Sequence, residues 1–291
     1  MTQYPSRYPL SVKKDRPTSA VTTAGIPRIL AIANQKGGVG KTTTAINLAT
    51  ALCAVGKRVM LLDLDPQGNA STGLGIKRAS IQKSTYDVLF GEVSVQQAAV
   101  ETRVPGLFVV PSSIHLSGAE IELVNAENRE YRLREALRIP LPYDYVLIDC
   151  PPSLNLLTLN ALVATDSIVV PLQCEFYALE GLSHLVKTIE RIRKHYNPAL
   201  DIHGVLLTMY DKRNNLSNQV ASDVREFFGD KVYTTMIPRN VRVSEAPSYG
   251  LPAIVYDMMS AGSQAYIHLA GEVLKRERAL NTPPAVETPA A

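Results

Sequence analysis

Short apolar runs alternate along the chain with longer segments in which apolar positions recur at helical spacing. The runs that predict strands are Ile29–Ala33, Arg58–Leu62, Leu107–Val110, Tyr145–Ile148, Ser167–Pro171, Val205–Thr208 and Val232–Ile237. The segments that predict helices are Thr42–Val55, Ala119–Arg138, Asn155–Ala164, Gly181–His195, Leu216–Phe228 and Gly262–Leu280. Nearly continuous apolar strands separated by helices are typical of a parallel sheet buried on both faces. The pattern therefore predicts an α/β fold with a mostly parallel, twisted sheet and helices on both faces.

This alternation runs through residues 28–280 without a repeat or a linker, which predicts a single domain. Residues 1–27 are rich in Pro, Ser, Thr and Tyr and carry four basic side chains against one acidic, which predicts a disordered basic arm. Residues 281–291 contain three prolines and predict a second disordered tail. The chain has a net charge of +3, so the rest of it is balanced and a nucleic-acid surface would have to be a local patch.

The composition is that of an ordinary globular protein, with 46% hydrophobic and 20% charged residues in a chain of 291. No apolar run approaches the roughly 20 residues that a membrane span needs, and the N-terminus has no secretory apolar segment. The three cysteines, Cys53, Cys150 and Cys174, have no metal-ligand spacing. We interpret them as buried thiols in a reducing cytoplasm.

A glycine-rich loop follows the first predicted strand and precedes the first predicted helix. Its sequence is Lys36-Gly37-Gly38-Val39-Gly40-Lys41-Thr42-Thr43. Glycines allow backbone N–H groups to approach an anion, and the helix start adds its positive dipole end. In a P-loop, Lys41 reaches the β- and γ-phosphates and the Thr42 hydroxyl binds Mg²⁺. A second lysine, Lys36, indicates a polyanion to neutralise, so the sequence predicts a P-loop NTPase domain.

Two further strands end in carboxylates at the sheet edge where the P-loop lies. The second strand continues into Asp63-Leu64-Asp65-Pro66-Gln67-Gly68-Asn69, a loop suited to responding to a γ-phosphate. Asp65 is the better candidate to position the attacking water, whereas Asp63 is equally well explained as a cap of the loop. The apolar strand Tyr145–Ile148 ends in Asp149, the Walker B pattern, whose carboxylate holds Mg²⁺ through water.

These motifs together resemble one family closely. The loop Lys36–Thr43 matches the deviant Walker A signature of the ParA/MinD superfamily. The sequences DLDPQGN at 63–69, DCPPS at 149–153 and IPRNVRVSEAP at 237–247 are similar to the chromosomal ParA/Soj branch. The resemblance covers roughly Ile29 to Arg278 and implies an ATPase that uses ATP and Mg²⁺ to partition chromosomes.

The resemblance also implies roles for individual residues. Lys36 would cross a dimer interface to the partner's phosphates, and Gly37 would allow the close backbone contact there. Thr43 would contact the α-phosphate, and Pro238 and Asn240 would border the adenine. The remaining ATP-binding positions that the resemblance implies are Gly38, Val39, Gly40, Lys41 and Thr42. Asp65 and Asp149 would keep the roles given above.

Basic residues supply a predicted DNA surface. Lys187, Arg191 and Lys194 recur at helical spacing on one face of Gly181–His195, a pattern usual for a solvated face. The family places nonspecific DNA contacts at the positions of Arg213 and Arg242, and Lys187 is the candidate from the stripe. The implied partners are a second copy of the chain when ATP is bound, nonspecific double-stranded DNA and a ParB-type centromere-binding protein, in a cytoplasmic, nucleoid-associated location.

Three other classes share parts of this pattern. A MinD-like membrane ATPase needs a C-terminal amphipathic anchor, whereas the last predicted helix runs into Lys275-Arg276-Glu277-Arg278 and prolines, so we expect no membrane. An iron–sulfur reductase of the nitrogenase iron-protein type would need exposed Cys150 and Cys174 at a dimer axis. A NAD-dependent dehydrogenase has no use for the P-loop lysine, and no acidic ribose partner is evident.

Overall fold

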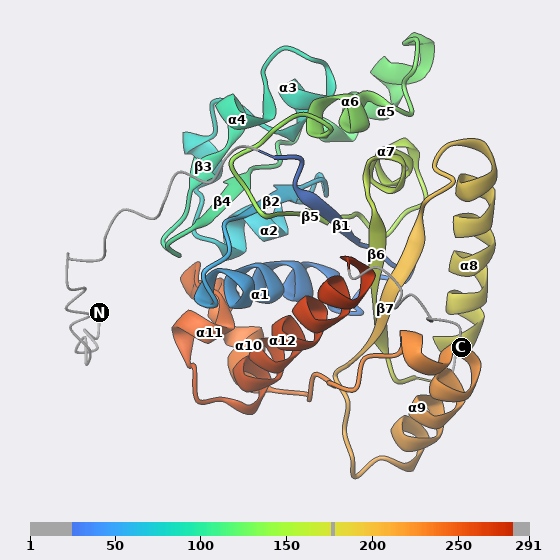
Figure 1. Cartoon of the computed structure of the whole chain (residues 1–291). Coiled ribbons are helices and arrows are strands. Elements are labelled where there is room, and N and C mark those ends of the chain that lie inside the picture. The colour runs from blue at the N-terminus through green and yellow to red at the C-terminus, as the bar shows by residue number, and fades with distance from the viewer. Residues whose placement is uncertain (1–24, 176–177, 282–291) are drawn as a thin grey trace, which may run out of the picture.

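A computed structural model describes residues 25–175 and 178–281, and a seven-stranded sheet forms the centre of this part of the chain (Figure 1). The strand order is β3-β4-β2-β5-β1-β6-β7, and every pair is parallel except β3 with β4. The strands are β1 (Arg28–Ile32), β2 (Val59–Asp63), β3 (Val100–Glu101), β4 (Leu107–Val110), β5 (Tyr145–Asp149), β6 (Ser167–Gln173) and β7 (Asp201–Thr208). The predicted α/β fold class is confirmed.

Helices cover both faces of the sheet (Figure 1). The longer helices are α1 (Lys41–Ala54), α7 (Leu156–Ala164), α8 (Ala178–His195), α9 (Asn215–Phe228) and α12 (Ala261–Asn281). The shorter ones are α2 (Asn69–Gly73), α3 (Thr85–Leu89), α4 (Val95–Ala98), α5 (Leu116–Glu122), α6 (Arg132–Leu137), α10 (Val241–Glu245) and α11 (Ala253–Tyr256). Crossover helices of this kind connect parallel strands and bury the sheet between two layers.

The alternation of side chains along β1 shows how the sheet separates two cores. Ile29 and Ala31 pack with side chains of α7, α8 and α9, whereas Leu30 and Ile32 pack with α1 and α12. All four side chains are fully buried. A strand that is apolar on both faces can sit only in the interior of such a sheet, and β1 indeed lies between β5 and β6. This central position carries the P-loop.

The predicted helix Ala119–Arg138 is wrong as a single element. The chain forms α5, a short 3₁₀ turn at Leu123–Asn125, and then α6 after an irregular stretch. Asn128 has a positive φ of 53°, a conformation that interrupts a right-handed helix and that asparagine tolerates better than most residues. The apolar spacing therefore continued across a turn.

The predicted strand Val232–Ile237 is also wrong, because the segment forms only isolated bridges at Val205–Val232 and Tyr210–Pro238. The backbone N–H groups of Thr234 and Thr235 donate to the Glu272 carboxylate of α12, at 2.8 and 3.0 Å, instead of to a neighbouring strand. The sheet consequently ends at β7 on this side. The short β3 was not predicted.

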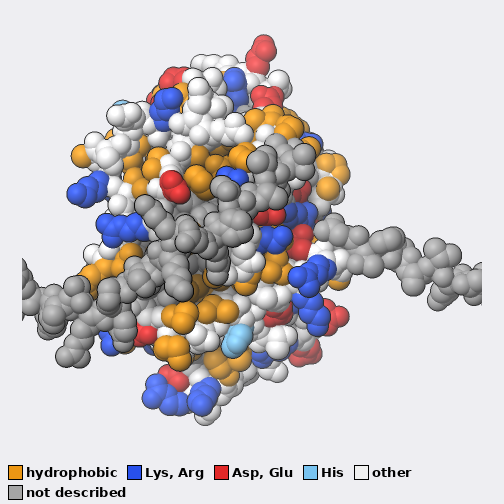
Figure 2. Space-filling view, turned by 60° about the vertical axis from the view of Figure 1, so that its left-hand side comes forward, with side chains coloured by type: hydrophobic (Ala, Val, Ile, Leu, Met, Phe, Trp, Pro, Cys, Tyr) orange, Lys and Arg blue, Asp and Glu red, His pale blue; other side chains and the backbone are white. Residues whose placement is uncertain are grey.

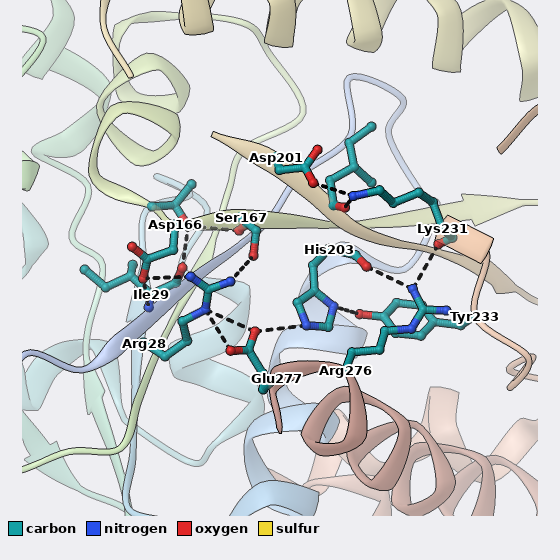
Figure 3. Close-up of polar contacts among 12 residues, drawn as sticks. Arg28, Ile29, Asp166, Ser167, Asp201, His203, Lys231, Tyr233, Arg276 and Glu277 are labelled. Carbon is teal, nitrogen blue, oxygen red and sulfur yellow. Dashed lines mark hydrogen bonds and ion pairs between the residues drawn. The ribbon is translucent and has the colours of Figure 1, made fainter. Parts of the chain in front are cut away.

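A network of charged groups fastens the end of α12 to the start of β1 and β7 (Figure 3). Glu277 accepts a hydrogen bond from Arg28 Nε at 3.0 Å and lies 3.0 Å from His203 Nε2. Arg276 lies over the Tyr233 ring, 4.3 Å from its centroid, and donates to the His203 carbonyl oxygen. A cavity of about 760 Å³ opens here, at the end of the sheet opposite the P-loop, but its charged side chains other than Asp230 are paired. We therefore assign this network to stability.

Most of the predicted arm, residues 1–24, and nearly all of the predicted tail, residues 282–291, lie outside the described residues. Gly25, within the arm as predicted, already bridges to Leu141. No helix in the described part of the chain is long and apolar enough to cross a membrane.

Candidate active site

The P-loop connects β1 to α1 with two glycines in the left-handed conformation. Gly38 has φ 74° and Gly40 has φ 86°, and Gly40 is the residue that precedes the first turn of α1. A Cβ at either position would strain the backbone, which explains why the loop requires glycine there. The Thr208 hydroxyl at the end of β7 donates to the Val39 carbonyl oxygen at 2.8 Å. The end of β7 thus holds the P-loop in place.

A cleft of about 490 Å³ lies over this loop. It brings together the predicted residues Gly37, Gly38, Gly40, Lys41, Thr42, Thr43, Asp65, Pro238 and Asn240. Lys36, Val39 and Asp149 are not among its lining residues. The backbone N–H groups of the loop and the start of α1 face a space large enough for a nucleotide.

The two lysines of the loop point to different places. Lys41 is buried and donates from Nζ to the Lys36 carbonyl oxygen at 3.0 Å. Burial lowers the pKa of Lys41, and the nearby Asp149 carboxylate opposes that shift. Lys36 instead turns outward, and its Nζ lies 2.8 Å from the Glu175 carboxylate, with the two side chains 36% and 48% exposed. Only one of the two ammonium groups therefore serves the cleft of its own chain.

Asp149, at the end of β5, is fully buried, and neither of its carboxylate oxygens has a hydrogen-bond partner. Burial and the neighbouring Asp63 raise its pKa well above the ordinary value, although Thr42 and Lys41 lie near enough to lower it. An unpartnered buried carboxylate is costly, and a cation beside it removes that cost. The position thus fits a Mg²⁺ ion that keeps its waters, consistent with Thr42 lining the cleft.

No group of three or more His, Cys, Asp or Glu side chains that could hold a metal occurs among the described residues. Mg²⁺ commonly binds through one or two carboxylates or hydroxyls together with substrate phosphates, so such a cage is unnecessary. The residues available, Thr42 and Asp149, match that arrangement.

The two aspartates after β2 have different surroundings. Asp63 is buried and accepts from the Ser71 backbone at 2.8 Å and the Ser71 hydroxyl at 2.6 Å, so it holds the loop in place as a cap does. Burial raises its pKa to about 6. Asp65 lines the cleft and accepts from the Gln67 N–H at 3.0 Å through Oδ1. Its Oδ2 has no hydrogen-bond donor in the described part of the chain, so this atom is available to a water.

Several cleft residues are not marked by the periodicity of the sequence. Met209 has a positive φ of 49°, and Arg239 and Tyr266 come from segments distant in sequence. The Asn240 side chain accepts from the Val243 N–H at 3.3 Å, so it starts α10 as well as lining the cleft. Sequence periodicity could not place these side chains, because only the tertiary contacts of α12 and the segment after β7 bring them to the P-loop.

The predicted DNA-binding side chains are all exposed, as is the stripe that also contains Arg191 and Lys194. Arg213 is 84% exposed and pairs with Asp211 at 2.9 Å. Arg242 is 53% exposed and pairs with Glu245 at 3.0 Å. Lys187 on α8 has no hydrogen bond or ion pair within the described residues. Figure 2 shows the side of the molecule turned away from α8 and α9, where basic and acidic side chains are mixed.

Comparisons with known proteins agree with this geometry. A family model described as an AAA domain matches residues 27–202. The chain is 65% identical over 254 residues to the chromosome partitioning protein ParA of Caulobacter vibrioides, covering 86% of this chain and 95% of that protein. It is 56% identical over 247 residues to the sporulation initiation inhibitor protein Soj of Bacillus subtilis, covering 84% and 98%.

Solved structures show the same fold. Cobyrinic acid a,c-diamide synthase from Mycobacterium smegmatis, with a bound ATP analogue and magnesium, superposes with a TM-score of 0.76 at 38% identity, covering 87% of this chain and 97% of that one. MinD from Pyrococcus horikoshii, with Mg-ADP, gives 0.72 at 27% identity, covering 88% and 99%. With relatives this similar and a P-loop cleft of this construction, the chain belongs to the ParA/Soj family of chromosome-partitioning ATPases.

Proposed function

We propose that this protein is an ATP-driven DNA-partitioning switch, in which two ATP-bound subunits form a sandwich dimer that binds DNA without sequence preference. Hydrolysis, stimulated by a ParB-type centromere-binding partner, releases the dimer from the nucleoid. The reported family membership supports the ATPase and partitioning parts of the proposal. The site geometry supports the dimer.

The observation that carries the dimer is the outward direction of Lys36. Lys41 already occupies the cleft, whereas the Lys36 ammonium lies at the protein surface beside Glu175. A second subunit that approaches the same surface would bring its triphosphate within reach of this surface cation. Two polyanions that face each other in a dry interface repel strongly unless cations lie between them. One lysine from each subunit meets that requirement.

Within one subunit the described residues divide the work of hydrolysis. The loop N–H groups and Lys41 bind and orient the phosphates, and Asp65 Oδ2 orients the attacking water. When bound, Mg²⁺ would neutralise charge on the β- and γ-phosphates, held by Thr42 and, through water, by Asp149. No arginine other than Arg239 lines the cleft, so basal turnover is expected to be slow and open to stimulation in trans.

A MinD-like membrane ATPase is the second candidate, because MinD shares the fold. The last helix argues against it. Leu269, Ala270 and Val273 of α12 are buried against α1 and the sheet, and Glu277 is engaged in the network of Figure 3. A helix that contributes its apolar face to the core has none left for a bilayer.

The burial of Cys150 and Cys174 argues against an iron–sulfur reductase. Cys150 is 1% exposed and Cys174 is 5% exposed. Burial raises the pKa of the Cys174 thiol to about 11 and that of Cys150 further. Cluster ligands must be thiolates that face a shared interface, so these two positions suit core packing better.

Co-sedimentation with DNA and with anionic liposomes, each in ADP, ATP and a nonhydrolysable ATP analogue, tests the proposal. We expect DNA to pellet the protein only with a triphosphate, and liposomes to leave it in the supernatant. Pelleting with liposomes but not DNA would support the MinD-like alternative. Equal DNA pelleting in ADP would show that dimerisation is not the switch.

A further inference from the structure

We propose that Glu175 is a positioning residue that keeps Lys36 on its own subunit until a dimer forms, so that release of the Lys36–Glu175 pair is part of the nucleotide switch. This inference rests on the proposed role of Lys36 in the dimer. It adds a residue from the loop between β6 and α8, and an ion pair that each subunit must break before its lysine can cross.

The Glu175 carboxylate is fixed on both oxygens. Oε2 accepts from Lys36 Nζ at 2.8 Å, and Oε1 accepts from Gln173 Nε2. The backbone is fixed as well, because the Glu175 N–H donates to the Gln173 carbonyl oxygen at 2.8 Å. The Glu175 carbonyl oxygen in turn accepts from the Ala178 N–H, at the start of α8, at 2.9 Å. A carboxylate held this way sets the direction of the lysine.

The same segment contacts the two residues before Lys36. Asn34 Nδ2 donates to the Pro171 carbonyl oxygen of β6 at 2.7 Å, and Gln35 Nε2 donates to Thr188 Oγ1 of α8 at 3.4 Å. Three consecutive residues at the start of the P-loop are therefore bonded to the segment from β6 to α8. Thr188 is adjacent to Lys187 of the proposed DNA surface. A rearrangement of Lys36 would consequently affect α8, the helix that carries Lys187.

The pair is strong enough to orient the lysine and weak enough to break. Exposed ion pairs change an equilibrium by about 1.4- to 5-fold. A symmetric dimer breaks two of them, so their joint effect on the dimer dissociation constant is roughly 2- to 30-fold. Two facing triphosphates offer each lysine a more highly charged partner than one carboxylate, and the exchange then favours the dimer.

Dimerisation of Glu175→Gln, measured by light scattering across protein concentrations with a nonhydrolysable ATP analogue, tests the inference. We expect the variant to dimerise roughly 2- to 30-fold more tightly than the wild type, with a difference that shrinks as salt rises. The matched control is Glu180→Gln, which removes the same charge from an exposed position in the first turn of α8, where the side chain has no hydrogen bond or ion pair within the described residues. Equal gains in both variants would reduce the effect to general charge and overturn the inference.

A zero-length carbodiimide cross-link between Lys36 and Glu175, detected by mass spectrometry, reports the contact directly. We expect it in the nucleotide-free monomer of the wild type and of Glu180→Gln, and a marked loss when the analogue drives dimerisation. An unchanged cross-link yield in a confirmed dimer would overturn the inference while leaving the dimer intact. Absence of any wild-type dimer would instead reject the proposed function, and the monomer cross-link would still report the pair. Glu175→Asp keeps the charge but has a side chain one methylene shorter, so it should hold Lys36 less well. A partial gain in dimer affinity in this variant would separate the effect of positioning from that of charge.

Discussion

The Lys41 ammonium donates a hydrogen bond to the backbone carbonyl oxygen of Lys36 at 3.0 Å, so one lysine of the P-loop fixes the backbone of the other. The side chain of Lys36 then leaves in the opposite direction, toward Glu175. A nucleotide that draws Lys41 onto its phosphates would remove this internal hydrogen bond, while the Lys36 N–H stays bonded to Asn34 Oδ1 at 3.0 Å. Under the proposed function, this contact would link nucleotide binding in one subunit to the reach of Lys36 toward another.

Lys36→Ala should retain the fold and nucleotide binding but fail to form the ATP dimer. The Lys36 side chain is partly exposed and its one ion pair lies at the surface, so its loss should change the free energy of unfolding by less than about 1 kcal/mol. Without its ammonium, the facing phosphates would remain unscreened. Size-exclusion chromatography with light scattering in a nonhydrolysable analogue measures the result, and a normal dimer would exclude a role in trans.

Gly37→Val should fail to dimerise for a steric reason. A Cβ built at Gly37 meets nothing within 4 Å, so the monomer accommodates the side chain. A branched side chain at the exposed rim would obstruct a second backbone that approaches closely. We expect a melting temperature close to that of the wild type together with loss of the ATP dimer. A dimer of wild-type affinity would show that Gly37 is not at the interface.

Asp65→Ala should uncouple nucleotide binding from hydrolysis. The substitution removes the carboxylate that would orient water but leaves the loop glycines, Lys41 and Thr42 in place. Positioned groups of this kind contribute about 10² or more to rate, so steady-state phosphate release should fall at least 100-fold. Nucleotide affinity by fluorescence titration should stay within a few-fold. Asp63→Asn is the contrasting variant, and it is expected to loosen the loop around Ser71. Unchanged turnover in Asp65→Ala would show that Asp65 has no part in the mechanism.

The sequence identified the P-loop and the Walker B strand because both are local. A strand, a glycine loop and a helix follow one another within residues 28–54, and β5 ends directly in Asp149. The two wrong elements failed where tertiary contacts decided the backbone. Glu272 accepts from the Thr234 and Thr235 N–H groups, whereas those of Tyr233 and Ile237 donate to β7, so the segment only bridges to the sheet. The spacing of apolar side chains alone cannot predict which acceptor these backbone N–H groups will find.

The parts of the site that were not predicted have the same origin. Lys36 and Glu175 are 139 residues apart in sequence, and Thr44 and Tyr266 are 222 apart. A resemblance to a family supplied Pro238 and Asn240, which periodicity would have left as an ordinary turn. Nothing in the pattern marked Met209, which has a positive φ and lines the cleft directly after β7.

Glu277→Gln should destabilise the fold without affecting the nucleotide site. Glu277 is 6% exposed and pairs with Arg28 from β1 and His203 from β7, so the variant should lose about 1–3 kcal/mol of unfolding free energy at pH 7. Hydrogen bonding to His203 and the charge of Arg28 lower the pKa of Glu277 below its ordinary 4.5, against the opposing effect of burial.

A lowered folded pKa means that the contribution is present above pH 4.5 and is lost as pH falls through the folded value. The stability gap between wild type and Glu277→Gln should therefore narrow below pH 4.5. Urea unfolding at pH 7 and in the acid range measures both gaps. A gap that stays constant into acid would show that packing, and not the carboxylate charge, holds α12.

Substitution of Arg213 and substitution of its ion-pair partner Asp211 should change the DNA affinity of the dimer in opposite directions. Arg213 donates to Asp211 through Nε and a terminal nitrogen, and these contacts lower the pKa of Asp211 to about 2. A DNA phosphate must therefore compete with this carboxylate. Arg213→Ala should weaken binding on any sequence and flatten the plot of log K against log salt by about two units per dimer, because each phosphate contact contributes about 0.9. Asp211→Asn should tighten binding, since it frees Arg213 and removes a repelling charge.

Arg242→Glu should abolish retention on DNA while nucleotide binding persists. Fluorescence anisotropy across a salt titration in the triphosphate state distinguishes these results, and wild-type binding by all three variants would place the DNA surface elsewhere on the molecule.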